Sequence, residues 1–274
     1  ASSMASSMAN ITANSVVVWT IANHKGGVGK TTTAVTLGGL LAQSGQRVII
    51  VDTDPQASLS YYFGIESEEL MRSLYNIFIA GKSVTKEDVL NCLCATKLDS
   101  LFILPATMAL ATLDRKLGAQ SGMGLILRQA LALISEEFDY AIVDCPPVLG
   151  VLMINALAAC DRVIVPVQTE FLALKGLERM LYSMQVMQKS LAKTFAYTIV
   201  PTMFDKRVNA AAKSYSALIQ THKEKVWVGL IPIDTRFRDA SQAQSPPSVY
   251  CPKARGVFAY ARLLSYLQKL ETQK

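Results

Sequence analysis

The segment His24–Thr33 constrains the fold of this chain more than any other. It reads HKGGVGKTTT and stands between an apolar, β-type run at Val16–Ala22 and a stretch with helical spacing. A strand, a glycine-rich turn and a helix in this order build the loop that wraps the phosphates of a nucleotide. The glycines let backbone N–H groups approach those phosphates, because no Cβ stands in the way. The sequence therefore predicts a site for a di- or triphosphate.

The residue types within this loop predict separate roles. Lys30 is placed to reach the β- and γ-phosphate oxygens, and the Thr31 hydroxyl is placed to bind Mg²⁺. We expect the other contacts to the nucleotide along the same turn, at Lys25, Gly26, Gly27, Val28, Gly29 and Thr32. The predicted cofactors are therefore ATP or ADP together with Mg²⁺.

One departure from the usual G-x-x-x-x-G-K-[ST] pattern narrows the kind of nucleotide-binding protein that the loop predicts. His24 occupies the position of the first glycine, and Lys25 adds a second lysine. A lysine at the mouth of the loop can reach the phosphates of a facing subunit, where it would stabilise negative charge during phosphoryl transfer. This predicts a homodimer that encloses ATP, with Lys25 as a catalytic residue. The alternative is a glycine-rich turn with solvated lysines.

Composition predicts one domain. The chain has 274 residues, of which 51% are hydrophobic, so it can bury one sizeable core, which we place at residues 16–274. Residues 1–15 repeat ASSM and lack the basic start and apolar stretch of a signal peptide, so we expect a cloning remnant or a disordered tail. No apolar run is long enough to span a bilayer. The five scattered cysteines favour buried thiols in a reducing cytoplasm.

Positive charge is concentrated in the last quarter of the chain. Residues 200–274 hold twelve Lys/Arg against five Asp/Glu, whereas residues 1–199 hold fifteen against sixteen. Such asymmetry favours a polyanionic partner for the C-terminal part, with DNA as the first candidate. The alternative is a solvated basic face that aids solubility.

Helical and strand patterns alternate along the chain. This alternation predicts an α/β fold: a single domain with a mostly parallel, twisted sheet and helices on both faces. The expected strands are 47–52, 101–105, 139–144, 162–167, 196–201 and 226–231, in addition to the first run. The expected helices are 31–43, 122–136, 151–160, 172–191, 208–222 and 256–270.

Three aspartates follow predicted strands, where ligands of such sheets bind. Asp144 is expected to hold Mg²⁺, through a water, opposite Thr31. Asp52 and Asp54 would share one face if their strand continued, and we assign Asp52 to the metal shell and Asp54 to the attacking water. The alternative for each is an acid that caps the next helix.

Three segments together resemble a known family. They are Ala22–Gly64, Phe138–Pro147 and Val200–Arg207, and they are similar to the ParA branch of the ParA/MinD ATPases with a deviant Walker A motif. The resemblance implies a cytoplasmic ATPase that dimerises around two ATP molecules, hydrolyses them slowly and positions a cargo. It also implies that Lys25 contacts the nucleotide of the partner subunit and that Asp54 supports hydrolysis.

A narrower similarity involves Leu149–Met180 and Ile231–Ser248, which resemble the ParA-like proteins encoded with chemotaxis genes. This similarity implies that the cargo is a chemotaxis signalling array, with a protein adaptor and array components as partners and concentration at a cell pole. The alternative is a plasmid or chromosome partition ATPase of the ParA type, which binds DNA without sequence preference and associates with the nucleoid.

Partition proteins contact DNA through basic residues near the C-terminus, and Arg207, Arg236 and Arg238 lie at or close to similar positions. The alternative is local pairing of these arginines with neighbouring aspartates. The stretch ASQAQSPPSVYCPKARG departs from the family, which commonly has glycine after the last strand. By resemblance, adenine would contact the ends of the last two strands, at Pro201, Met203, Pro232 and Asp234.

Three other classes share parts of this pattern. A membrane-cycling MinD-type protein ends in an amphipathic helix, but the leucine face at 263–270 is explained more simply by packing in the core, so a membrane partner is not expected. An iron protein would need cysteines in a cluster-binding arrangement, and Cys92 and Cys94 lack that context. An ATP-dependent amide or carboxylate ligase would need a substrate pocket that the sequence does not reveal.

Overall fold

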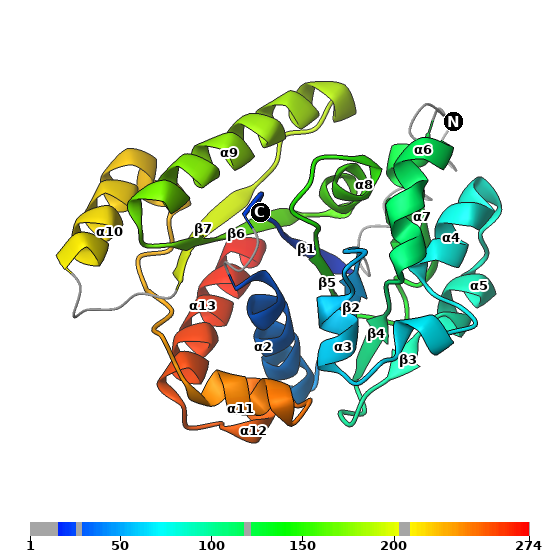
Figure 1. The fold of residues 1–274 in the computed structure, drawn as a ribbon, viewed down its shortest axis with the longest axis horizontal. Coiled ribbons are helices and arrows are strands. Elements are labelled where there is room, and N and C mark those ends of the chain that lie inside the picture. The colour runs from blue at the N-terminus through cyan, green and yellow to red at the C-terminus, as the bar shows by residue number, and fades with distance from the viewer. Residues whose placement is uncertain (1–15, 26–28, 118–121, 203–208, 274) are drawn as a thin grey trace, which may run out of the picture.

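The computed structural model describes residues 16–25, 29–117, 122–202 and 209–273. Its centre is a sheet with strand order β3-β4-β2-β5-β1-β6-β7, in which only the β3–β4 pair is antiparallel (Figure 1). The predicted single α/β domain with a mostly parallel sheet is therefore confirmed. The strands are β1 (Val17–Ile21), β2 (Val48–Asp52), β3 (Cys94–Ala95), β4 (Leu101–Leu104), β5 (Tyr140–Asp144), β6 (Arg162–Gln168) and β7 (Tyr197–Thr202).

Helices cover both faces of this sheet. α2 and α13 pack on one face, and α4, α5, α7, α8 and α9 pack on the other (Figure 1). The helices are α2 (Lys30–Gln43), α3 (Ser58–Tyr62), α4 (Leu74–Ala80), α5 (Lys86–Asn91), α6 (Leu113–Leu117), α7 (Ile126–Leu133), α8 (Val151–Ala159), α9 (Phe171–Leu191), α10 (Asn209–His222), α11 (Arg236–Gln242), α12 (Pro247–Tyr250) and α13 (Arg255–Thr272).

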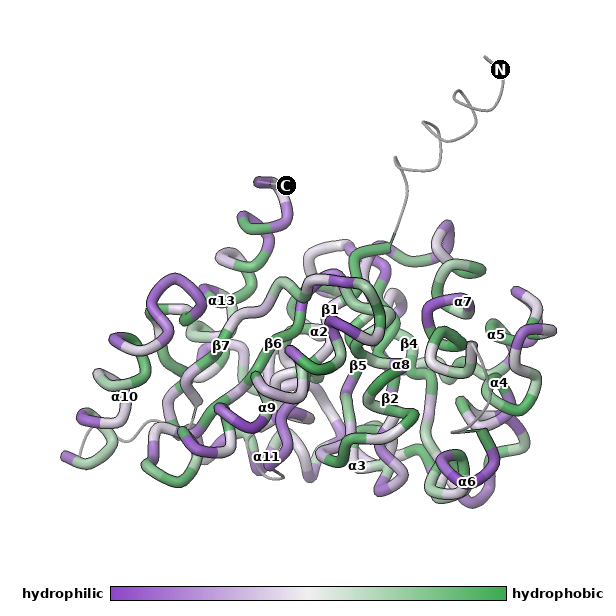
Figure 2. The backbone as a smooth tube through the Cα atoms, turned by 90° about the horizontal axis from the view of Figure 1, so that it is seen from above, coloured by the Kyte–Doolittle hydropathy of each residue, from purple (hydrophilic) through white to green (hydrophobic). Residues whose placement is uncertain are grey.

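The central strand β1 shows why these sequences form buried strands. Trp19 and Ile21 pack against α2 and α13, whereas Val18 packs into the cluster on the opposite face. A parallel strand covered on both sides is apolar at successive positions, and the tube in Figure 2 is accordingly hydrophobic along the inner strands. The parallel pairing of β1 with β5 and β6 places residues 22–25 at the carboxyl edge of the sheet.

The closing helix α13 packs in the core, as its leucine pattern predicts. Leu263 and Leu267 are fully buried against α2, and the Tyr260 hydroxyl lies 2.9 Å from Oγ1 of Thr33. The apolar face is therefore already covered by protein. In the described part of the chain, no helix combines the length and the apolar composition needed to cross a bilayer.

Two predicted elements are wrong in detail. The segment 226–231 forms no regular strand among the described residues: an isolated bridge joins Val226 to Ile199, and the backbone bends at 228–229 before the Ile231 N–H bonds to β7 again. The helix predicted over 122–136 is shorter, with a 3₁₀ turn at Met123–Leu125 ahead of α7. Residues 1–15, for which a remnant or tail is predicted, lie outside the described residues.

A nearly buried ion pair joins α13 to the sheet and gives a first prediction. Glu271 accepts hydrogen bonds from Nε of Arg162 and from Nε1 of Trp19, both at 3.4 Å, and the two charged side chains are only 13% and 10% exposed. Glu271→Ala leaves the Arg162 charge poorly paired, so we expect a loss of about 2 kcal/mol in the free energy of unfolding, measured with urea.

The matched control for this variant is Glu137→Ala. Glu137 pairs with Lys86 at 2.6 Å, but both side chains are more than 40% exposed, so we expect no measurable loss in the free energy of unfolding. Equal losses in the two variants would refute the structural role of the Arg162–Glu271 pair.

Candidate nucleotide-binding site

The candidate site lies at the carboxyl edge of β1, β2 and β5. β5 lies between the other two strands, and its register pairs Ile21 of β1 and Asp52 of β2 with Asp144. Because these strands are parallel, the segments that follow them meet at one edge of the sheet. The loop after β1 is thereby placed beside two buried aspartates.

The start of α2 brings together four of the predicted residues: Gly29, Lys30, Thr31 and Asp144. Gly29 has φ 86°, a left-handed conformation that favours glycine, and α2 begins at the next residue. Nζ of Lys30 donates to the carbonyl oxygen of Cys145 at 3.1 Å, and Oγ1 of Thr31 donates to Oδ2 of Asp144 at 3.1 Å. The N-terminus of α2, a buried lysine and a hydroxyl–carboxylate pair therefore lie next to one another at the carboxyl edge of the sheet.

This donor set fits a nucleotide with Mg²⁺. Thr31 and Asp144 offer the oxygen ligands that Mg²⁺ prefers, and Lys30 offers a cation for phosphate. Among the described residues, no cluster of three His, Cys, Asp or Glu could hold a metal alone. Mg²⁺ at phosphate sites uses few protein ligands, since phosphate and water complete its shell. When bound, the ion would neutralise charge on the phosphates.

Electrostatics at this edge also favour a cation. Burial raises the pKa of both Asp52 and Asp144, and the nearby Asp52 carboxylate raises that of Asp144 further. Lys30 and the Thr31 hydroxyl act in the opposite direction on Asp144. The positive charge near these two carboxylates is therefore too small to offset the effect of burial on their pKa values. A divalent cation at this edge would favour their ionised forms.

The structure separates Asp52 from Asp54. β2 ends at Asp52, so the expectation that a continuing strand places both side chains on one face is wrong. Asp52 is fully buried and accepts hydrogen bonds from the Ser60 hydroxyl at 2.7 Å, the Ser60 N–H at 3.0 Å and the Asp54 N–H at 3.1 Å. Asp54 is half-buried, and its Oδ1 accepts from the N–H of Gln56 at 2.9 Å.

Side chains at the entry to the loop fasten it to neighbouring elements. Nδ2 of Asn23 donates to the carbonyl of Pro166 in β6, and Oδ1 of Asn23 accepts from the N–H of Lys25. Nζ of Lys25 forms an exposed ion pair with Oε1 of Glu170 at 2.6 Å, just before α9. Asn23 and Glu170 were not predicted from the sequence, because nothing local in a sequence shows which distant element a side chain meets.

The predicted adenine contacts are partly brought together. The Ile231 N–H donates to the Pro201 carbonyl at 2.9 Å, which places Pro232 close to the end of β7. The Asp234 carboxylate instead accepts hydrogen bonds from the N–H groups of Arg236 and Gly256, each at 3.1 Å. Its oxygens are therefore engaged by α11 and α13.

The basic residues predicted to contact DNA lie on α11. Arg236 and Arg238 are both exposed in its first turn, and Nε of Arg236 pairs with Asp234 at 3.5 Å. Five predicted site residues lie outside the described residues: Gly26, Gly27, Val28, Met203 and Arg207. Thr32 follows Thr31 in α2 and lines a groove of about 630 Å³ with residues of α3 and α11, among them Tyr61 and Phe237.

This fold and site define a P-loop nucleotide-binding protein of the α/β class. Comparison with known proteins refines this conclusion. A family model described as an AAA domain matches residues 16–197. The sporulation initiation inhibitor protein Soj of Bacillus subtilis is 37% identical over 244 residues, covering 89% of this chain and 94% of that protein. The chromosome partitioning protein ParA of Myxococcus xanthus is 34% identical, covering 93% and 88%.

Solved structures agree on the fold. Cobyrinic acid a,c-diamide synthase from Mycobacterium smegmatis, with bound ATP analog and magnesium, has a TM-score of 0.80 and 29% identity, covering 94% of this chain and 97% of that one. An ATP complex of a single-residue variant of Cyanothece McdA has a TM-score of 0.81 at 24% identity, covering 93% and 97%. The chain belongs to the ParA/MinD family of ATPases.

Proposed function

We propose that this protein is a partition-type ATPase that binds ATP with Mg²⁺, dimerises around the nucleotide, and binds DNA without sequence preference to position a cargo. The observation that carries the proposal is the site at the start of α2, where Lys30 and Thr31 meet the carboxyl end of β5. Support comes from relatives named as chromosome partitioning proteins and from a related structure with bound ATP analog and magnesium.

Each residue of the site has a role in this proposal. Lys30 exchanges the Cys145 carbonyl for phosphate oxygens, and Thr31 and Asp144 hold Mg²⁺, with Asp52 supporting its water shell. Lys25 leaves its exposed ion pair and reaches the nucleotide of the partner subunit. Asp54 orients the attacking water. Hydrolysis is slow, so that the ATP-bound dimer persists long enough to act as a switch.

The cargo is the finer part of the proposal. A relative named as a chromosome partitioning protein favours a chromosome as the cargo, and we place the ATP dimer on the nucleoid in the cytoplasm. A chemotaxis array reached through a protein adaptor at the cell pole is the alternative, supported by the resemblance of Leu149–Met180 and Ile231–Ser248 to chemotaxis-associated proteins. The two proposals differ in whether DNA is the track.

DNA binding tests this difference directly. We expect fluorescence anisotropy to show binding to a duplex of arbitrary sequence with ATP, weaker binding with ADP, and a steep loss between 50 and 200 mM salt, by about 10-fold or more. Light scattering on the same samples should report dimers with ATP. Dimerisation without DNA binding would refute DNA as the track and favour a protein adaptor.

Charge reversal on α11 tests the basic surface. Arg236→Glu with Arg238→Glu should weaken DNA binding at least ~10-fold and leave ATP-dependent dimerisation intact, because both side chains are exposed. The matched control is Arg128→Glu, an exposed arginine of α7, which packs on the other face of the sheet. Equal weakening by the control would mean that net charge, not this surface, binds DNA.

A further inference from the structure

His24 makes two hydrogen bonds that join the nucleotide loop to separate parts of the fold. Its Nδ1 lies 2.9 Å from the carbonyl oxygen of Pro147, in the loop that follows β5. Its Nε2 lies 2.7 Å from Oγ of Ser183, near the middle of α9. One half-buried imidazole thus bridges three elements that are far apart in sequence.

The protonation pattern of this bridge follows from its partners. The Pro147 carbonyl can only accept, so Nδ1 of His24 carries a proton and donates. In the neutral ring Nε2 then accepts from the Ser183 hydroxyl. A glycine, the usual residue at this position of the motif, could make neither contact.

Two of the described hydrogen bonds join the loop after β5 to the nucleotide-binding motif. Nζ of Lys30, the first residue of α2, donates to the Cys145 carbonyl, and Nδ1 of His24 donates to the Pro147 carbonyl. Lys30 is the phosphate ligand of the proposed function, so its contact is given up when ATP binds. The His24 contact uses no group that the phosphates need.

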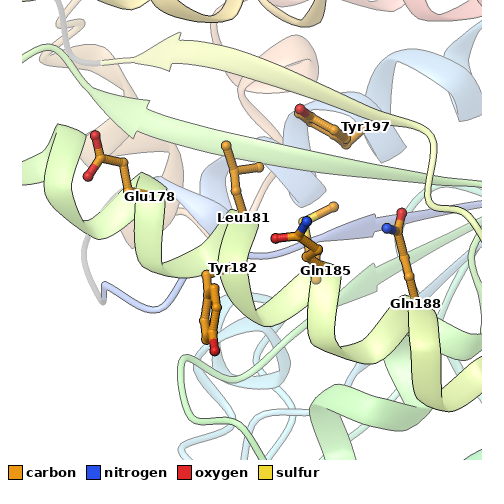
Figure 3. A pocket seen from close by; sticks show the side chains of 7 residues that line it. Glu178, Leu181, Tyr182, Gln185, Gln188 and Tyr197 are labelled. Atoms are coloured by element: carbon orange, nitrogen blue, oxygen red, sulfur yellow. The ribbon is translucent and has the colours of Figure 1, made fainter.

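The imidazole is also reached from the outside of the molecule. His24 lines a surface groove of about 710 Å³ with side chains of α9, including Glu178, Tyr182 and Ser183. Figure 3 shows the adjoining hollow along the same helix, of about 430 Å³, in which Glu178 and Tyr182 are again among the lining side chains. His24 therefore joins the start of the nucleotide loop to the side of α9 that borders this groove.

We infer that His24 is a positioning residue for ATP hydrolysis, which keeps the nucleotide loop, the loop after β5 and α9 in register during turnover. Lys25 follows it directly, and Asp144 lies three residues before its Pro147 partner. Losing the bridge would let these two functional groups shift relative to each other, which slows the chemical step more than it weakens binding. This inference rests on the proposed ATPase activity.

The test compares a substitution that removes both hydrogen bonds of His24 with one that keeps the hydrogen bond to Pro147. His24→Ala removes both hydrogen bonds, so we expect kcat for ATP hydrolysis to fall about 10-fold while the Kd for fluorescent ATP changes less than ~3-fold. In His24→Asn the amide N–H can replace Nδ1 and reach Pro147. We expect this variant to regain most of the lost kcat, because it restores the tie between the two loops.

Two further variants keep the inference falsifiable if His24→Ala folds poorly. Ser183→Ala removes only the contact to α9, and we expect a fall in kcat of about 3-fold. Arg179→Ala changes another residue of the same groove, and kcat should stay within ~2-fold of the wild type. Thermal unfolding of each variant would separate a loss of fold from a loss of positioning.

Several outcomes would overturn the inference. These are unchanged kcat in His24→Ala, a loss of nucleotide affinity as large as the loss of kcat, or a His24→Asn variant no better than His24→Ala. Absence of ATP turnover in the wild-type protein would instead refute the proposed function, so the two failures are distinguishable.

Discussion

Lys25→Ala should lower ATP turnover by about 100-fold or more while nucleotide binding stays within ~3-fold of the wild type. Lys25 lies at the mouth of the loop, 41% exposed, and within the described residues its ammonium group contacts Glu170 and no buried group of the nucleotide site. An exposed ion pair of this kind contributes less than about 1 kcal/mol, so it does not prevent the lysine from reaching a facing subunit. The positive charge of Lys25 would then contribute to catalysis only in the dimer.

Three measurements check this prediction: phosphate release, titration with a fluorescent nucleotide, and light scattering with ATP. Lys86→Ala is the matched control, because Lys86 forms an ion pair of the same 2.6 Å length with Glu137 and similar exposure, far along the chain from the loop. Normal turnover in Lys25→Ala would exclude a catalytic role in trans. Loss of nucleotide binding would show that Lys25 acts within its own subunit.

The fold was predictable where burial is periodic. β1, β2, β5 and β6 are apolar runs covered on both faces, and their patterns alone located them. The segment 226–231 has the same apolar character, but its backbone bends at 228–229 and leaves an isolated bridge at Val226 in place of a strand. The two-residue strand β3 is too short to leave a pattern. In both segments, contacts with other parts of the fold determine the backbone conformation, and the local sequence pattern does not.

The parts of the site that the sequence could predict are the residues of the phosphate-binding motif and the acid at the end of a buried strand. Lys30 and Thr31 belong to a motif with a fixed geometry, and Asp144 ends a buried strand that neighbours β1. The roles of Ser60, at Asp52, and of Glu170, at Lys25, depend on segments 8 and 145 residues away. A single sequence carries no local pattern for such contacts, so only the assembled fold reveals them.

Asp54→Ala should trap the protein as an ATP-bound dimer, with turnover reduced about 100-fold. The structure distinguishes this residue from Asp52, whose two oxygens accept three hydrogen bonds inside the protein. Asp54 stands beyond the end of β2 and is only half-buried, and Oδ1 accepts one backbone hydrogen bond, from Gln56. Among the described residues, Oδ2 accepts none, so this oxygen can orient a water molecule.

Sizing with light scattering in Mg·ATP would report the trapped dimer, and phosphate release would report the lost turnover. The control is Asp99→Ala, an exposed aspartate just before β4, at the opposite edge of the sheet. A monomer in Mg·ATP would show that Asp54 is needed to assemble the dimer and not to hydrolyse ATP. The hydrolytic role would then pass to another group at the carboxyl edge, and Asp144, whose Oδ2 accepts from Thr31, would be the next acid to substitute.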